Sequence, residues 1–254
     1  DDARAELEPQ EKAEIAYQEC GTGMSSLGGR RTRPTLTAHP ERASYLLQIG
    51  LARHAPDRPL TVPLKQRIHE LVESVEEVIR PKIESADVVW ALAWQGGHVE
   101  HDLSHYITAR VVRQLSIAVG VEKPFYELPA YEIFFLVPLR FAPWHKGEAH
   151  RFLLTPEELR LKEAAFAAYK SQVEITYAFK HLIRIYGIIS ALRLKPFGFK
   201  KFAGEEHFGP VPAHRDYNVS PHGNQLFDYI LEDYKKVRIT FGNSLARIVE
   251  EMEG

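Results

Sequence analysis

An unbroken apolar run at residues 88–94 constrains the fold of this chain more than any other feature. It follows Asp87 and ends at Gln95-Gly96-Gly97, so its length and composition are those of a strand that is buried on both faces. We expect its two tryptophans, Trp90 and Trp94, in the core. Amphipathic helices are predicted before the run, ending near Pro81, and directly after it. Their apolar positions are Ile68, Leu71, Val72, Val75, Val78 and Ile79 in the first helix, and Leu103, Tyr106, Ile107, Val111, Val112 and Leu115 in the second. This helix–strand–helix order predicts an α/β fold.

Three later segments extend the pattern. The aromatic and aliphatic residues at 131–138 predict another strand. Thr155, Pro156 and Glu158 form the capping box and first turn of a helix that continues to about residue 187. Periodic apolar residues over 226–253 predict a long C-terminal helix.

The composition excludes several classes of protein. The chain has 254 residues, 44% of them hydrophobic and 26% charged, as in an ordinary globular protein. Its formal net charge of -2 gives no general attraction for nucleic acid or for an anionic membrane, so we expect neither as a partner. The single cysteine, Cys20, excludes an internal disulfide and a CxxC metal site, and no apolar stretch approaches the roughly 20 residues of a membrane span. We therefore expect a cytoplasmic protein.

Four polar residues follow the predicted strand closely: His98, Glu100, His101 and Asp102. In open parallel sheets, ligands bind at the carboxyl ends of strands, where the next helix offers unpaired N–H groups. Imidazole nitrogens ligate Zn²⁺, and nearby carboxylates orient the ligands or transfer protons. The same residues also suit a structural role, with Asp102 at the start of the helix and His98 bonded to backbone in a turn. The spacing alone leaves both interpretations open.

The segment WQGGHVEHD resembles the GGHPDHD segment of the LmbE-like, or PIG-L, family of zinc-dependent N-acetylglucosaminyl deacetylases, with Val99 for proline and Glu100 for aspartate. LTPEELRLKEAAFAAYKSQ resembles the family segment that ends in tyrosine-x-serine-glutamine, and EEHFGPVPAHRDYNVSPHG resembles the glutamate-x-phenylalanine segment of longer members. The resemblance covers roughly residues 64–254. It implies a three-layer α/β/α Rossmann-like domain with a mainly parallel sheet. The whole chain, 1–254, would be that one domain, and residues 190–254 would be its C-terminal helical extension.

The resemblance also implies a role for each residue of the cluster. His101 would ligate Zn²⁺, and His98 would stabilise the oxyanion of the tetrahedral intermediate. Glu100 would orient the His98 imidazole, and Asp102 would support the site from behind or cap the helix. Zinc can lower the pKa of bound water to about 7 and polarise an amide carbonyl. The implied substrate is an N-acetylated sugar or glycoconjugate, and the products are acetate and a free amine.

One motif of the family has no counterpart here. Its general base and two further zinc ligands come from an Ala-His-Pro-Asp-Asp motif at the end of the first strand. The nearest string, at residues 37–42, has Glu41 at the base position and Arg42 where a metal-binding carboxylate should stand. Arginine cannot ligate zinc, so we interpret this string as a chance match at a helix start. Either the chain lacks an N-terminal part that includes the first strand, or its metal site is incomplete.

These alternatives lead to two functional hypotheses. The leading one is Zn²⁺-dependent hydrolysis of an N-acetyl group on an amino sugar or glycoconjugate. The other is a non-catalytic carbohydrate- or partner-binding member of the same fold. Hydrolysis requires another histidine and a carboxylate within coordination distance of His101, since catalytic zinc normally has three protein ligands.

Overall fold

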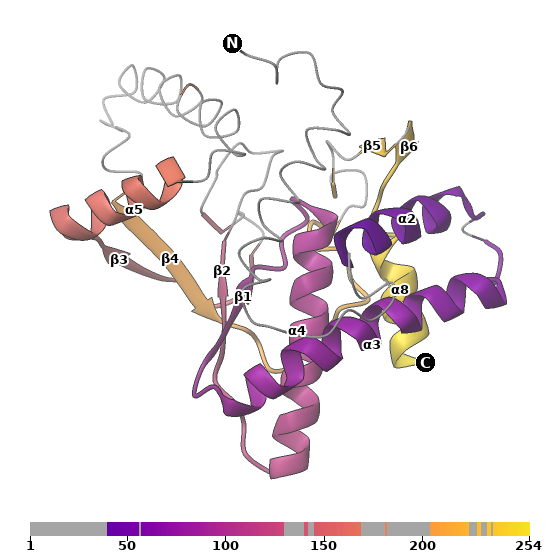
Figure 1. Cartoon of the computed structure of the whole chain (residues 1–254), viewed down its shortest axis with the longest axis horizontal. Helices are drawn as coiled ribbons and strands as arrows, with labels where there is room; N and C mark the ends of the chain where they lie inside the picture. Colours follow the sequence, from indigo (N-terminus) through magenta and orange to yellow (C-terminus); the bar gives the residue numbers. More distant parts are fainter. Residues whose placement is uncertain are drawn as a thin grey trace, which may run out of the picture.

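The computed structural model describes residues 40–55, 57–129, 140–141, 145–168, 181, 204–223, 228–229, 233–234 and 236–254 (Figure 1). The strand expected at residues 131–138 and most of the helix expected beyond Ala168 lie outside these ranges. The elements in chain order are α2 (Pro40–Arg53), α3 (Val62–Ser85), β1 (Val89–Leu92), α4 (Val99–Val119), β2 (Phe125–Leu128), β3 (His150–Leu153), α5 (Pro156–Ala168), β4 (Glu205–Pro210), β5 (Asp233–Tyr234), β6 (Val237–Arg238) and α8 (Leu245–Glu253).

The main sheet has four strands in the order β1-β2-β4-β3, and it is mixed. β1 and β2 are parallel, whereas β4 is antiparallel to both β2 and β3. The α/β class is therefore confirmed, but the described strands do not form a mainly parallel sheet. β3 and β4 carry polar residues such as Arg151 and Glu206; β3 is mostly exposed and β4 is half-buried.

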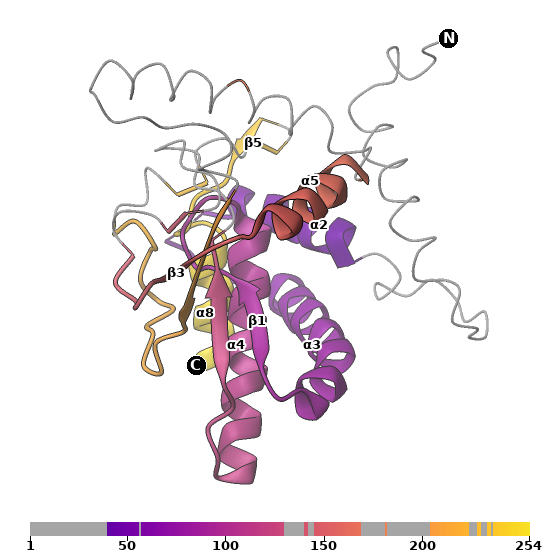
Figure 2. The same ribbon diagram turned by 90° about the vertical axis from the view of Figure 1, so that its left-hand side faces the viewer.

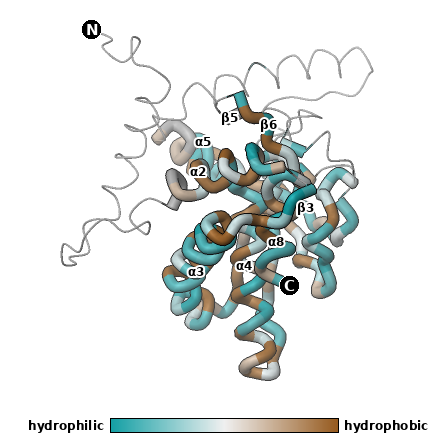
Figure 3. The backbone as a smooth tube through the Cα atoms, turned by 90° about the vertical axis from the view of Figure 1, so that its right-hand side faces the viewer, coloured by the Kyte–Doolittle hydropathy of each residue, from teal (hydrophilic) through white to brown (hydrophobic). Residues whose placement is uncertain are grey.

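The helices pack on one another through α4, which contacts β1, α3 and α8. Figure 2 shows α4 behind β1 and β2, with α3 beside it. Hydrophilic and hydrophobic residues alternate along α3, as expected for a helix with one buried side (Figure 3). The core combines residues of α2, α3, α4 and α8 with Trp94, Tyr229 and Phe241. Among the described helices, none is both long and apolar enough to cross a bilayer.

The two tryptophans of the apolar run differ in burial. Trp94 is 7% exposed, as expected, but Trp90 is 47% exposed and stacks on Tyr126 at 4.9 Å between ring centroids. Successive residues of a strand point to opposite faces, so Val89 faces α4 and Trp90 faces away from it. The prediction that Trp90 lies in the core is wrong, because this strand is buried on only one face.

Helix boundaries were predicted best where local signals define them. The Thr155–Glu158 capping box is confirmed: the Thr155 N–H donates to Glu158 Oε2 at 2.7 Å, and the Glu158 N–H donates to Thr155 Oγ1 at 3.3 Å. α3 continues past Pro81 to Ser85, because buried Ile83 packs against Val89 and so holds the last turn in place.

The long C-terminal helix expected at 226–253 is wrong. Its described residues instead contain the β5–β6 hairpin, and among them α8 is the only helix. Lys236 takes a left-handed conformation with φ of 62° in the turn of the hairpin. Thr240 and Asn243 then bond each other's backbone N–H groups, in place of helical hydrogen bonds. The extension over 190–254 also supplies β4 to the main sheet, so its described part is not purely helical.

Candidate functional site

The predicted polar cluster lies where β1 passes into α4. β1 ends at Leu92, residues 93–97 form a loop, and α4 begins at Val99 with His98 as its N-cap. β1 and β2 are parallel neighbours, so this loop lies at the carboxyl edge of the parallel part of the sheet, as expected. We call residues 93–98 the strand-end loop.

His98 and His101 lie together on this loop and the first turn of α4. Their rings stack at 4.8 Å between centroids with an interplanar angle of 30°. Burial, and to a smaller extent the neighbouring His98, lower the pKa of His101 to about 4. His101 is therefore neutral at pH 7, which is the form of imidazole that ligates metal ions.

The tautomer of His98 follows from its cap contact. The Glu100 N–H donates to His98 Nδ1 at 3.3 Å. Because Nδ1 accepts this bond, the ring proton lies on Nε2, which is a donor. This contact of Glu100 with the imidazole comes from the backbone. His98, and not Asp102, is the capping residue of α4.

Asp102 binds the strand-end loop from inside the molecule. Its carboxylate accepts hydrogen bonds from the Gln95 N–H at 3.1 Å, the Gly96 N–H at 2.9 Å and the Tyr229 hydroxyl at 3.0 Å. Burial raises the pKa of Asp102 to about 7, against these three hydrogen bonds, which lower it. Asp102 thus fixes the loop that carries His98.

A segment more than 100 residues downstream closes over the same loop. The Tyr229 N–H donates to the Gly96 carbonyl at 2.9 Å. Next to it, buried Asp228 bonds both the hydroxyl of Ser220 and Nδ1 of His222. These residues were not predicted as part of the site, because no spacing in the sequence links the turn at His222 to Gly96.

Gln95 adds an unsatisfied polar group to the strand-end loop. Its side-chain amide oxygen and nitrogen are buried and make no hydrogen bond in the structure described here. An amide buried in this way normally finds a partner, because leaving it unpaired costs about 1–3 kcal/mol. A polar ligand is the kind of group that would satisfy it.

A buried ion pair between Arg215 and Glu127 lies next to the start of the strand-end loop. Arg215 donates two hydrogen bonds of 2.6 Å to Glu127 of β2, and the Trp94 N–H lies 3.4 Å from the same carboxylate. His105 of α4 lies beside this ion pair, with its Nδ1 3.8 Å from Glu127 Oε2 and its Nε2 3.5 Å from Arg215 Nη1. Its Nε2 is also 3.0 Å from the Tyr217 hydroxyl. These residues were not predicted either, since a lone polar residue in a short strand gives no sequence signal.

The donor chemistry of the cluster suits zinc, but the number of donors is too small. Within the described ranges, no three His, Cys, Asp or Glu side chains converge so that they could hold a metal ion. His39 of the string at 37–42 lies outside those ranges. Pro40 is the first residue of α2, in agreement with a helix start at this string.

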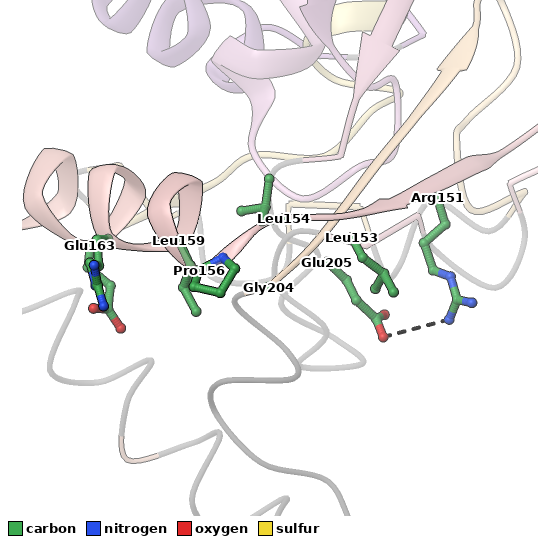
Figure 4. Close-up of a pocket in the computed structure, with 9 residues that line it drawn as sticks. Arg151, Leu153, Leu154, Pro156, Leu159, Glu163, Gly204 and Glu205 are labelled. Carbon is green, nitrogen blue, oxygen red and sulfur yellow. Dashed lines mark ion pairs between the residues drawn. The ribbon is translucent and has the colours of Figure 1, made fainter.

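A separate pocket of about 740 Å³ lies between β3, the start of α5 and β4 (Figure 4). Leu153, Leu154 and Leu159 line it, and Arg151 pairs with Glu205 at 3.6 Å beside them. None of the cluster residues lines this pocket.

Comparisons with protein-family models, curated proteins and solved structures find no match to this chain. The resemblance to the deacetylase family therefore depends on the sequence segments alone.

Proposed function

We propose that this chain is a Zn²⁺-dependent hydrolase that removes the N-acetyl group of an amino sugar or glycoconjugate, on a Rossmann-like fold. The main support is the stacked pair of His98, in the strand-end loop, and His101, in the first turn of α4. His98 presents an N–H donor, which can stabilise an oxyanion, and His101 is neutral, which allows it to ligate a metal ion. The single cysteine supports the cytoplasm as its compartment.

In this proposal, each residue of the polar cluster has its own role in hydrolysis. His101 would hold the metal, and bound zinc would polarise the acetyl carbonyl and lower the pKa of a bound water. His98 donates Nε2–H to the carbonyl oxygen as negative charge develops on it, while the Glu100 N–H keeps its ring in that tautomer. Asp102 holds the loop so that His98 keeps its position. Hydrolysis also needs further zinc ligands, and the described residues bring together no group of three donors that would supply them.

The test measures zinc content and acetate release with methyl N-acetylglucosaminide as the substrate. We expect about one zinc per chain and measurable hydrolysis, with both lost in His101→Ala. His214→Ala is the matched control, because it removes an exposed histidine from another part of the chain. Zinc-free wild-type protein, or equal activity in His101→Ala and wild type, would contradict the proposal.

The incomplete set of donors favours a second candidate, a non-catalytic binding protein of the same fold. It predicts that the wild-type chain releases no acetate but binds N-acetylglucosamine in a calorimetric titration. Under this alternative, His101→Ala leaves the bound zinc of the preparation unchanged. The same purified proteins therefore separate the two functions.

A further inference from the structure

We propose that His222, held by Asp228, is the general base of the strand-end site. It would be a catalytic residue that removes a proton from the water attacking the acetyl carbonyl. This inference rests on the proposed function and extends it. The family motif that would supply a base has no counterpart in this chain, and His222 lies outside that motif.

His222 lies against the strand-end loop. Its ring packs directly on the backbone of the strand-end loop: a Cβ at Gly96 would overlap the imidazole and lie 2.6 Å from Asp228 Oδ1. Gly96 has φ of 77°, so glycine suits both the turn and the close approach. Gly96 and His98 are two residues apart, at most about 7 Å of chain, so His222 packs on the same short loop that carries His98.

The partner of His222 sets its chemistry. Nδ1 bonds the carboxylate of Asp228, so the ring proton lies on Nδ1 and Nε2 becomes the basic nitrogen. The two side chains are 3% and 0% exposed, so the carboxylate is well placed to stabilise the imidazolium that forms when Nε2 takes a proton. A buried Asp–His pair of this kind is the arrangement that activates water or hydroxyl nucleophiles.

The two histidines that flank the loop are in opposite tautomers. The backbone N–H of Glu100 makes His98 a donor through Nε2, whereas the Asp228 carboxylate makes His222 an acceptor through Nε2. Hydrolysis of an amide needs one group of each kind, a donor for the oxyanion and a base for the water. The contacts of the two rings therefore make His98 the donor and His222 the base.

Gln95 independently points to a ligand at this position. Its amide group is buried on the same loop, and both of its polar atoms lack a hydrogen-bond partner within the described part of the chain. An N-acetyl group has one carbonyl acceptor and one N–H donor, which together match an unpaired amide. Gln95 would thus bind the group that His98 and His222 act on.

The step balances without a co-reactant. The water oxygen forms a bond to the carbonyl carbon, and one water proton moves to His222 Nε2. The C–N bond then breaks with its electron pair on nitrogen, and Nε2 returns the proton to the leaving amine. The products are the free amine and acetic acid, which loses its remaining proton to solvent.

The decisive variants are His222→Gln and Asp228→Asn in the full chain, with methyl N-acetylglucosaminide as the substrate. We expect kcat to fall by about 10²- to 10⁴-fold in each, as is usual when a general base is lost, with KM changed less than threefold. Zinc content should stay at the wild-type level. His214→Gln makes the same substitution at an exposed histidine of the same segment and should keep full activity.

Chemical rescue separates catalysis from a structural role. Added imidazole should restore hydrolysis to His222→Ala in proportion to its concentration, which repair of a merely loosened loop would not do. Should His222→Gln unfold in circular dichroism, Asp228→Asn decides, because it keeps the shape of the side chain.

Each negative result has a distinct meaning. If wild type hydrolyses the substrate and a folded His222→Gln or Asp228→Asn variant keeps a kcat within threefold of wild type, this inference is overturned. The proposed function then stays intact. The absence of hydrolysis by wild type overturns the proposed function and this inference with it.

Discussion

His105 shows how strongly a single buried side chain can depend on its charge state in this protein. Its Nδ1 is 2.7 Å from the carbonyl of Leu92, the last residue of β1, and its Nε2 is 3.0 Å from the Tyr217 hydroxyl. The Nδ1–H donates and Nε2 accepts, so both ring nitrogens are satisfied in the neutral form. Burial is the main cause that lowers the pKa of His105 to about 4; Arg215 lowers it further, and Glu127 acts against both.

This lowered pKa predicts that acid destabilises the fold. Between pH 6.5 and 4 the unfolded chain binds a proton at His105 that the folded chain rejects, so stability falls as the pH falls. We expect His105 to contribute a loss of about 2 kcal/mol in the free energy of unfolding from pH 7 to pH 5. Urea titrations at both pH values measure this loss.

The control for this prediction is His105→Gln. It should lower stability at pH 7 but reduce the loss between pH 7 and pH 5, while His214→Gln should leave that loss unchanged. An equal loss in wild type and His105→Gln would show that other groups cause the acid sensitivity. His101, His145 and His207, whose pKa values are also lowered by burial, would then be the next candidates.

α4 is bounded by two glycines with positive φ, and their surroundings differ. Gly120 caps its C-terminus at φ of 71°, where a Cβ would meet nothing within 4 Å. Gly96, just before its N-terminus, has φ of 77° with His222 and Asp228 against it. The two glycines have similar positive φ values and differ in the space around them.

Substituting alanine at each glycine should therefore separate the cost of a positive φ from the cost of steric overlap between the new Cβ and its neighbours. Gly120→Ala should cost about 1 kcal/mol, the cost of a left-handed residue. Gly96→Ala should cost about 3 kcal/mol or more, since the strain adds to the displacement of His222. Equal changes in the urea midpoints of the two variants would mean that the His222 ring does not press on Gly96.

The elements that could be predicted from the sequence are those determined by residues close together in the chain. The start of α5 follows from Thr155 and Glu158, three residues apart, and the sequence was enough to find it. The loop with His98 and His101 was also found, because a strand end, two glycines and a helix are contiguous. The burial of Trp90 was predicted wrongly, since it depends on which face of β1 meets α4. His222 and Asp228 were missed, because only the folded chain brings them to Gly96.

α8 connects the last part of the chain to the helices that precede and follow β1. It contacts α3 and α4, and its residues Leu245, Ile248 and Val249 are fully buried in the main core. Arg113 of α4 donates to Glu253 at 2.6 and 2.8 Å, and the Arg110 guanidinium bonds the Met252 carbonyl at 2.7 Å. The core is therefore incomplete without this helix.

Two isoleucines test the contribution of α8. Ile248→Ala should destabilise the protein by about 2–5 kcal/mol, because Ile248 is 0% exposed and its removal leaves a cavity. Ile117→Ala in α4 should change stability by less than about 0.5 kcal/mol, because Ile117 is 76% exposed. Thermal unfolding of both variants checks the difference, and similar melting temperatures would contradict the packing of α8.

The hydrogen bond between Asp102 and Tyr229 joins residues that are 127 positions apart. A ribosome that adds about 5–20 residues per second makes the aspartate roughly 6–25 s before the tyrosine. During that interval the nascent chain carries Asp102 and Gly96 without the hydroxyl and backbone N–H of Tyr229 that later bond them. The histidine pair is thus translated early and gains its final surroundings only when the C-terminal segment arrives.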